Sequence, residues 1–192
     1  PNGSGKSTLL KAISGQLTAD SGTAEIAGKQ VGQMSPSEIA QCVFHVNQDP
    51  LLGAAPKLTL FENLLVADVQ AQKDASPRHI LVDKYHTLLR KVGLSDRMKQ
   101  LARTLSGGER QLLAVVIAEL RPASIMLLDE PLAALDPVKA GLCVDIINSL
   151  HQQGRTILQV THDPPSALSG GDRTIVLREG KVVYDKEGSE RD

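Results

Sequence analysis

The sequence predicts an α/β protein in which helices flank a mostly parallel sheet. Residues 1–8 read Pro-Asn-Gly-Ser-Gly-Lys-Ser-Thr and lead directly into an apolar helical pattern at residues 9–17, as in a phosphate-binding loop that opens a helix. Residues 107–161 alternate helix and strand patterns, which is typical of a parallel sheet. The apolar strand at residues 124–128 runs into Asp129 and Glu130, and ligands of such sheets bind at the carboxyl ends of the strands.

The opening residues predict a phosphate site built mainly from backbone. Gly3 and Gly5 allow a tight turn whose N–H groups point into one concavity. Lys6 adds a positive charge for the outer phosphates, Ser7 offers a hydroxyl to Mg²⁺, and the helix start adds its dipole. The candidate nucleotide-binding residues are therefore Asn2, Gly3, Ser4, Gly5, Lys6, Ser7 and Thr8.

The first glycine of the motif G-x-x-x-x-G-K-[ST] would stand before Pro1. We therefore interpret the 192 residues as a fragment and expect that glycine, with one or more first strands of the sheet, to precede them. Unpaired strand neighbours are costly against a total stability of about 5–15 kcal/mol. We expect these residues on their own to fold poorly and to be inactive.

Composition predicts one domain with an aliphatic core, since 41% of the residues are apolar. A net charge of −1 argues against a surface built to bind nucleic acid. Cys42 and Cys143 lack metal-ligand spacing and are interpreted as reduced, buried thiols. The longest apolar run, residues 112–118, is far shorter than the roughly 20 residues of a membrane span, so we expect no direct membrane insertion.

Local signals in the first quarter of the chain predict short elements. Gly15 ends the first helix, and an extended segment at residues 23–27 turns at Gly28. Ser35 and Glu38 have capping-box spacing, with a helix at residues 36–41. The strand that follows, at residues 42–46, delivers Gln48 at its end.

Residues 49–105 show helical patterns and no strand pattern. Thr59 signals the start of a helix through Phe61, Leu64 and Leu65. Polar residues 72–78 precede a helix with Leu81, Tyr85, Leu88 and Val92 on one face, closed by Gly93. We predict a helical subdomain at 49–105, inserted into a core formed by 1–48 and 106–192, within a single domain overall.

The last part of the chain is predicted to complete the core. The expected elements are a helix at 107–119, a strand at 124–128, a helix from Asp136 to Gln153, a strand at 156–161 and a hairpin of 174–177 with 181–184 about Glu179 and Gly180. Residues 186–192 are expected to form a loose tail.

Two further motifs carry candidate chemistry. Asp129 is placed to hold Mg²⁺ beside Ser7, and Glu130 to polarise the water that attacks a phosphate. Two carboxylates in a solvated loop are the competing interpretation, which the phosphate loop in the same chain disfavours. Ser106 is the expected N-cap of a helix that begins with two glycines, and bare N–H groups there form a second anion site.

In their order and spacing these motifs resemble those of the nucleotide-binding subunits of ATP-binding cassette (ABC) transporters, over almost the whole chain from Pro1 to Tyr184. The resemblance identifies Asn2–Thr8 as the Walker A loop, Gln48 as the Q-loop glutamine, Leu105–Glu109 as the signature, Asp129 and Glu130 as Walker B with its catalytic carboxylate, Ala134–Asp136 as the D-loop and His162 as the switch histidine.

The resemblance implies a P-loop ATPase of the ABC type, with ATP and Mg²⁺ as cofactors, acting as a head-to-tail dimer. Glu130, His162 and Gln48 would be catalytic, and Ser7, Gln48 and Asp129 would hold the metal. The residues that would contact the other subunit's nucleotide are Ser106, Gly107, Gly108, Glu109 and Asp136.

The sequence departs from the family pattern in two places. Glu109 stands where glutamine is commoner, and the aromatic residue that stacks on adenine would lie before Pro1. Four histidines do not fall on any of the family motifs and are interpreted as surface or packing residues: His45, His79, His86 and His151.

The leading hypothesis is an ATP-hydrolysing motor of a membrane transporter, held at the cytoplasmic face of the membrane by permease subunits. Residues 48–56 and 58–64 resemble bacterial import ATPases for amino acids such as tryptophan or tyrosine, which implies an importer with an extracytoplasmic substrate-binding protein. The region near residues 53–65 would dock a permease helix. Alternatives are a soluble ABC ATPase acting on ribosomes or nucleic acid, although no second cassette or long coiled coil is present, and a non-hydrolysing regulatory module, which Glu130 and His162 argue against.

Overall fold

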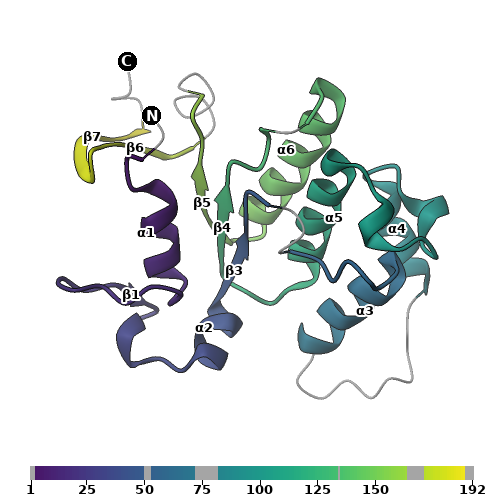
Figure 1. Ribbon diagram of the computed structural model, residues 1–192, viewed down its shortest axis with the longest axis horizontal. Helices are drawn as coiled ribbons and strands as arrows, with labels where there is room; N and C mark the ends of the chain where they lie inside the picture. Colours follow the sequence, from purple (N-terminus) through teal and green to yellow (C-terminus); the bar gives the residue numbers. More distant parts are fainter. Residues whose placement is uncertain (1–2, 50–52, 72–81, 134, 164–170, 189–192) are drawn as a thin grey trace.

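The computed structural model describes residues 3–49, 53–71, 82–133, 135–163 and 171–188 (Figure 1). In chain order, the helices and strands are α1 (Lys6–Ile13), β1 (Glu25–Ile26), β2 (Lys29–Gln30), α2 (Pro36–Cys42), β3 (Val43–Val46), α3 (Leu60–Ala71), α4 (Val82–Arg90), α5 (Gly107–Leu120), β4 (Ile125–Asp129), α6 (Pro137–Gln152), β5 (Thr156–Val160), β6 (Arg173–Arg178) and β7 (Lys181–Glu187). Short 3-10 helices are η1 (Val31–Gln33), η4 (Ser95–Arg97) and η5 (Ala102–Thr104).

A parallel sheet of order β3-β4-β5 forms the centre of the molecule. Because side chains alternate along a strand, Val43 and Leu127 pack with Leu10 of α1 on one face. Val46 and Leu128 pack on the other face, in the core that contains α5 and α6. Figure 1 shows the same layers, with α1 and α2 on one side of the sheet and α5 and α6 on the other. The predicted α/β class, with a parallel sheet flanked by helices, is confirmed.

The longest apolar run of the sequence lies in the central helix α5. Residues 112–118 lie in α5, and all seven are buried. A helix that is apolar on every side is a core helix, here enclosed by α3, α4, α6 and β3. Cys143 of α6 is buried and Cys42 is half-buried, both as free thiols, so burial was correctly predicted for only one of them.

Helices also dominate the described part of residues 49–105. The rings of Phe61 in α3 and Tyr85 in α4 meet edge to face at 5.5 Å, and the Tyr85 hydroxyl donates to Asp68 Oδ2 at 2.9 Å. One antiparallel bridge between Thr59 and Leu101 is an exception to the all-helical expectation. The division into core and subdomain stays a prediction, and residues 72–78 lie outside the described part.

Local signals correctly predict the end of α1 and the start of α2. After α1, the Gln16 N–H donates to the Lys11 carbonyl and the Gly15 N–H to Ala12, with Gly15 at φ 69. This is the Schellman pattern of helix ends. In α2 both hydrogen bonds of the Ser35–Glu38 capping box are present, but the predicted extended segment at 23–27 is only the two-residue strand β1.

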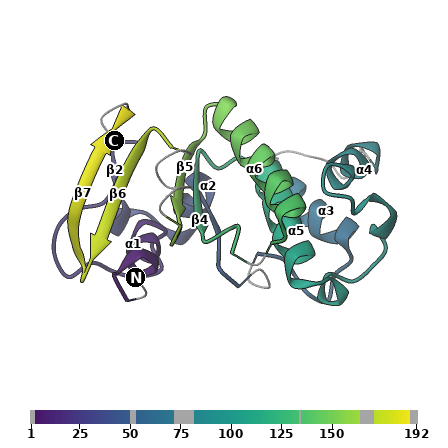
Figure 2. The ribbon, with the colours of Figure 1, turned by 90° about the horizontal axis from the view of Figure 1, so that it is seen from above.

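The hairpin β6–β7 is longer than the sequence indicated. β7 continues to Glu187, and the Gly188 N–H donates to the Asp172 carbonyl. The cross-strand pair of Arg173 and Asp185 holds this end with hydrogen bonds of 2.7 and 2.8 Å. The loose tail predicted from residue 186 is therefore wrong for residues 186–188. Figure 2 shows the hairpin beside α1, at the end of the molecule opposite α3 and α4.

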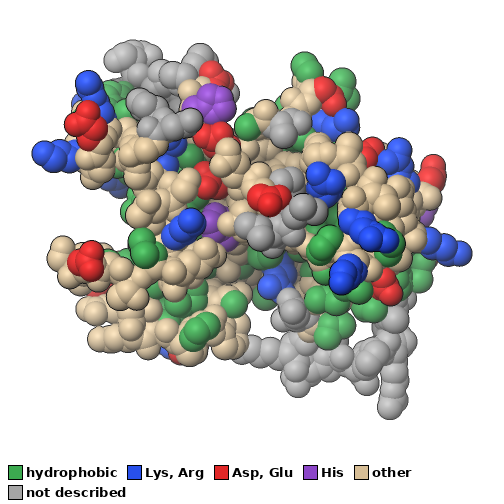
Figure 3. Space-filling model, viewed as in Figure 1, with side chains coloured by type: hydrophobic (Ala, Val, Ile, Leu, Met, Phe, Trp, Pro, Cys, Tyr) green, Lys and Arg blue, Asp and Glu red, His purple; other side chains and the backbone are tan. Residues whose placement is uncertain are grey.

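The surface of the molecule carries charged side chains of both signs. In the face shown in Figure 3, Lys and Arg side chains gather over the half of the molecule built by α3 to α5, interspersed with acidic ones. No helix within the described ranges has both the length and the apolar character of a membrane span.

Candidate nucleotide-binding site

The loop before α1 has the backbone that a phosphate cradle requires. Gly3 and Gly5 adopt φ of 78° and 96°, a left-handed conformation that glycine takes without steric cost. Gly5 is the N-cap of α1, and no side chain caps that end, so the first N–H groups of the helix are left for an anion. Lys6 donates to the Ser4 hydroxyl at 3.2 Å. Of the predicted loop residues, Asn2 lies outside the described part, whereas Ser7 and Thr8 are exposed in the first turn of α1.

The turn of the β6–β7 hairpin supports this loop from behind. The Gly180 N–H donates to the Ser4 carbonyl at 3.1 Å, and Ser4 itself is only 4% exposed. A Cβ on Gly5 would lie 3.6 Å from the Gly180 Cα. The hairpin turn therefore fixes the rear of the loop, a contact that no sequence pattern predicts.

The predicted carboxylates lie at the end of β4. Asp129 pairs with Val160 as the last residue of the strand and is only 8% exposed. Glu130 follows with φ 50, and its N–H donates to the Val160 carbonyl at 3.0 Å. This left-handed step turns the chain away from the sheet and directs the Glu130 carboxylate to His162, whose Nδ1 lies 3.1 Å from Glu130 Oε2.

Glu130 and His162 line a small cavity beyond the strand ends. Its volume is about 210 Å³, and its other lining residues are Pro131, Leu132, Ala133, Gln159, Thr161 and Asp163. The Asp163 N–H donates to the Thr161 hydroxyl at 3.0 Å, which fixes the backbone on either side of His162. The pair of carboxylate and imidazole therefore faces a space in which water can be held.

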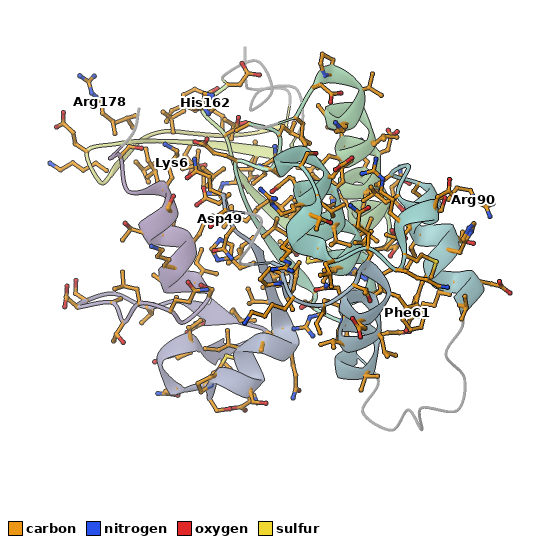
Figure 4. All side chains as sticks on the ribbon, turned by 45° about the vertical axis from the view of Figure 1, so that its right-hand side comes forward. Lys6, Asp49, Phe61, Arg90, His162 and Arg178 are labelled. Carbon is orange, nitrogen blue, oxygen red and sulfur yellow. The ribbon has the colours of Figure 1, made fainter. Side chains whose placement is uncertain are left out.

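The register of the sheet places Gln48 near the same edge. Val46 pairs with Leu128, so Gln48 and Glu130 each lie two residues past a paired position on adjacent strands, which are about 4.8 Å apart. Gln48 is exposed. Figure 4 shows Lys6, Asp49 and His162 in one region, where the strands end and α1 begins. Glu130 and His162 are thus in contact, and Lys6 begins α1 in the same region (Figure 4). The roles of these residues in a nucleotide site stay a prediction.

The predicted signature, residues 105–109, is at the start of α5 and not at this edge of the sheet. Ser106 is the N-cap of α5: its hydroxyl accepts from the Glu109 N–H at 3.3 Å, and the Glu109 carboxylate accepts from the Ser106 N–H at 2.8 Å. Ser106 is exposed, and a Cβ on Gly107 would meet no atom within 4 Å. Because α5 and α1 are on opposite sides of the sheet (Figure 1), the two predicted phosphate sites do not meet within one chain.

Asp136 caps α6 by accepting from the Lys139 N–H at 3.1 Å. The Lys139 ammonium lies 2.9 Å from its second oxygen, and this hydrogen bond lowers the pKa of the Asp136 carboxyl. Among the predicted D-loop residues, Ala134 lies outside the described part.

A second cavity, of about 340 Å³, lies between β3, residues 53–58, α3 and α5. The Arg121 guanidinium covers the Phe44 ring at 5.4 Å on its wall. His45 also lines it, and both its ring nitrogens are buried without a hydrogen-bond partner in the described structure. Burial lowers the pKa of His45, opposed by the charge of Asp129, so the ring is neutral at pH 7.

Of the other described histidines, His151 is exposed and lies 3.5 Å from Asp172. His86 is half-buried, and its Nδ1 accepts from the Arg90 guanidinium at 3.1 Å. His79 lies outside the described part.

Sequence reasoning missed four residues around these sites. Arg97, Gly180 and Arg121 act across long separations in the chain, so no local pattern identifies them. Asn63 was detectable in principle, because a polar residue on the apolar side of the helix pattern at 60–65 calls for a hydrogen-bonding role.

Comparison with known proteins decides the family. The family model described as "ABC transporter" matches residues 1–133. The chain is 34% identical over 197 residues to a tyrosine transport ATP-binding protein of Clostridioides difficile, covering 100% of this chain and 78% of that protein. It is 35% identical to the phosphonates import ATP-binding protein PhnC of Caulobacter vibrioides, covering 99% and 76%. Export proteins of the family match as well.

This chain belongs to the ATP-binding subunits of ABC transporters. The ABC ATP-binding cassette MJ0796, solved as a dimer in a post-hydrolysis state with ADP and Pi, superimposes with a TM-score of 0.83 at 26% identity, covering 97% of this chain and 82% of that one. The fold is therefore that of an ABC-type P-loop ATPase domain. ATP-binding domains of this family are ATPases that bind ATP.

Proposed function

We propose that this ABC chain is the ATP-hydrolysing motor subunit of a bacterial importer. One observation carries the proposal: the Glu130 carboxylate lies 3.1 Å from His162 Nδ1, at the strand edge where Lys6 begins the helix of the phosphate loop. A general base, a polar partner for it and a phosphate cradle at one edge are the parts that phosphoryl transfer to water needs.

The donors around the loop suit a magnesium nucleotide. Ser7, Gln48 and Asp129 offer hydroxyl, amide and carboxylate oxygens, the ligand types that Mg²⁺ prefers. No group of three or more His, Cys, Asp or Glu side chains in the described ranges could hold a metal. A single carboxylate agrees with an ion that shares its ligands with phosphate oxygens and water, where it would neutralise charge on the outer phosphates.

In the hydrolytic step, Glu130 accepts a proton from the water that attacks the outermost phosphorus, and the bond from that phosphorus to the leaving ADP oxygen breaks. The His162 imidazole holds the Glu130 side chain and contacts the transferred phosphoryl group. Lys6 and the loop N–H groups, with Gly3 and Gly5 at their turns, stabilise charge on the phosphates. Gln48 would contact the metal and the attacking water, and would connect the site with the residues that follow β3.

A second copy completes the site. Ser106, Gly107, Gly108 and Glu109 of one subunit, with Asp136, contact the nucleotide in the other subunit's loop. The support is the exposed N-terminus of α5, whose bare backbone is an anion site, on the side of the sheet away from α1 (Figure 1).

The cavity of about 340 Å³ is proposed as the permease dock. Its walls combine apolar side chains such as Ala54, Leu58 and Ile117 with Arg121, and an amphipathic helix fits a groove of this kind. The core at 1–48 and 106–192 would then carry the nucleotide and the subdomain at 49–105 would meet the membrane subunits. The chain would work at the cytoplasmic face, with an extracytoplasmic protein supplying an amino acid.

Glu130→Gln in the full-length protein tests this function. General-base assistance is worth about 10²–10⁴ in rate, so we expect phosphate release to fall at least that far while ATP binding persists. Lys6→Ala is the contrasting variant, in which binding itself is lost. Undiminished phosphate release in Glu130→Gln would remove Glu130 from the catalytic role.

The partner is tested by co-expression with a permease encoded beside this protein. We expect the protein to sediment with membranes only when the permease is present, and amino-acid uptake into cells to require Glu130. Recovery with nucleic acid, independent of any permease, would favour an ABC ATPase that acts on ribosomes or DNA.

A further inference from the structure

A negative charge lies at the predicted contact between the signature and the other subunit's nucleotide. The Glu109 carboxylate stands in the first turn of α5, where Oε2 accepts from the Ser106 N–H at 2.8 Å. This capping box stabilises the helix start. It also places an anion beside N–H groups that are proposed to face a triphosphate. The negative charges of the Glu109 carboxylate and of the triphosphate repel each other.

Arg97 lies against the other oxygen of the same carboxylate. Its Nη1 donates to Glu109 Oε1 at 2.8 Å. This hydrogen bond links η4 with the signature. The Arg97 side chain is 46% exposed and that of Glu109 is 18% exposed, so the ion pair is partly shielded from solvent. Such a pair is screened less than one fully in water.

Glu109 is ionised at neutral pH and so needs a cation for neutrality. The Ser106 backbone N–H lowers the pKa of Glu109 most, and the charges of Arg97 and Lys139 lower it further. Lys139 is itself paired with Asp136 at 2.9 Å. Arg97 is thus the cation in direct contact with the signature carboxylate.

The chain provides its own comparison for a purely structural role. Glu62 forms the same box with Thr59 at the start of α3, and no ion pair of Glu62 occurs within the described ranges. Glu38 forms a third box with Ser35, and Lys29 lies 3.4 Å from it. A capping box therefore forms with or without a cation, and Arg97 is not required to make the cap.

We propose that Arg97 is a positioning residue for the nucleotide of the opposite subunit: it neutralises Glu109, so that the N-terminus of α5 can approach a triphosphate. This inference rests on the proposed function. Arg97 acts through Glu109, and its contribution is electrostatic.

The direct test measures the ATP concentration that drives association of two Glu130→Gln subunits, by light scattering, with and without Arg97→Gln. We expect Arg97→Gln to raise the half-maximal ATP concentration about 1.5- to fivefold, as for a charge interaction of partly exposed groups. The shift should shrink at 1 M salt, where the Debye length is about 3 Å, and Arg97→Lys should restore most of the affinity.

Two comparisons separate charge from structure. In a Glu109→Gln background the carboxylate is gone, so Arg97→Gln should cause no further shift. Lys29→Gln removes a cation from the matching box on α2, far from the signature, and should leave the ATP requirement unchanged.

A mixed pair tests whether the effect reaches the opposite nucleotide. When Arg97→Gln and Lys6→Ala are in the same subunit, the one remaining nucleotide faces the altered signature, and the shift should appear. When they are in different subunits, that nucleotide faces an intact signature, and the shift should vanish.

The possible failures are distinguishable. An unchanged ATP requirement in Arg97→Gln, or a shift that persists with Glu109→Gln, would overturn the role of Arg97. ATP-driven association without any phosphate release by the wild-type protein would instead overturn the proposed hydrolysis, while the role of Arg97 is still decided. Absence of ATP-driven association would contradict both.

Discussion

Glu130 has a strained backbone conformation that orients its side chain. Its φ of 50 is uncommon for a residue with a Cβ, and such backbone costs on the order of 1–3 kcal/mol. The hydrogen bond from its N–H to the Val160 carbonyl opposes relaxation. The strain is therefore held by the pairing of β4 with β5, and it directs the carboxylate to His162 rather than along the strand.

Cys143 gives a residue-scale prediction about pH. Burial raises the pKa of its thiol to about 12, whereas the pKa of a cysteine in an unfolded chain is about 8.5. Above that lower value the unfolded chain releases a proton that the folded chain keeps, so the free energy of unfolding falls as pH rises toward 12. At pH 10 the loss attributable to this thiol is about 2 kcal/mol.

Urea unfolding at pH 8 and pH 10 measures this loss in the full-length protein. Cys143→Ala should lose less stability than the wild type between these pH values, and Cys42→Ala serves as the matched control because Cys42 is half-buried. Equal pH dependence in all three proteins would contradict the assignment.

At the scale of elements, the sequence was most informative where the signal is local. Ser35, Thr59, Ser106 and Asp136 each cap the helix they were expected to start, because a cap needs only its neighbours. The end of β7 was misjudged, since its length depends on Arg173, which is twelve residues away from its partner Asp185 in the chain.

Contacts between elements account for what sequence reasoning missed in the candidate site. The position of Asp129, Glu130 and His162 at one edge of the sheet was predictable, because each follows an apolar strand of one parallel sheet. The Gly180 contact with Ser4 and the Arg97 pair with Glu109 join elements whose approach is a consequence of packing. No pattern within either segment encodes such a contact.

Asn63 gives a prediction about the loop that precedes α3. Its side chain is 5% exposed, accepts from the Ala55 N–H at 2.7 Å and donates to the carbonyls of Ala55, Leu58 and Thr59. One buried amide thus organises residues 55–59 on the wall of the proposed permease dock. Asn63→Leu would leave backbone groups unpaired, which costs about 1–3 kcal/mol each in buried sites.

Thermal unfolding and permease co-purification test the role of Asn63. We expect Asn63→Leu to lower the melting temperature and to weaken permease binding more than it changes ATP binding. Asn63→Asp keeps the shape and the acceptor but loses the amide donors, so it should be destabilised as well. A stable Asn63→Leu with normal permease binding would show that the loop holds its shape without this residue.

At the scale of the whole molecule, the separation of the two candidate phosphate sites predicts assembly. Lys6 opens α1 on one side of the sheet, and Ser106 opens α5 on the other (Figure 1). In the proposed head-to-tail pair, the loop of one copy and the signature of the other would enclose each nucleotide from two sides.

We therefore expect Glu130→Gln to form a stable dimer in ATP with Mg²⁺ and to remain a monomer in ADP, because the outermost phosphate is what reaches the second subunit. Sedimentation velocity measures the change, and Lys6→Ala in the same background should remain monomeric in both nucleotides. Ser106→Ala should bind ATP yet associate poorly, whereas Ser35→Ala loses an equivalent cap, worth about 1 kcal/mol, without affecting association. Equal association of the two cap variants would mean that the signature hydroxyl does not contact the nucleotide, and a dimer that forms without nucleotide would contradict ATP as the bridging group.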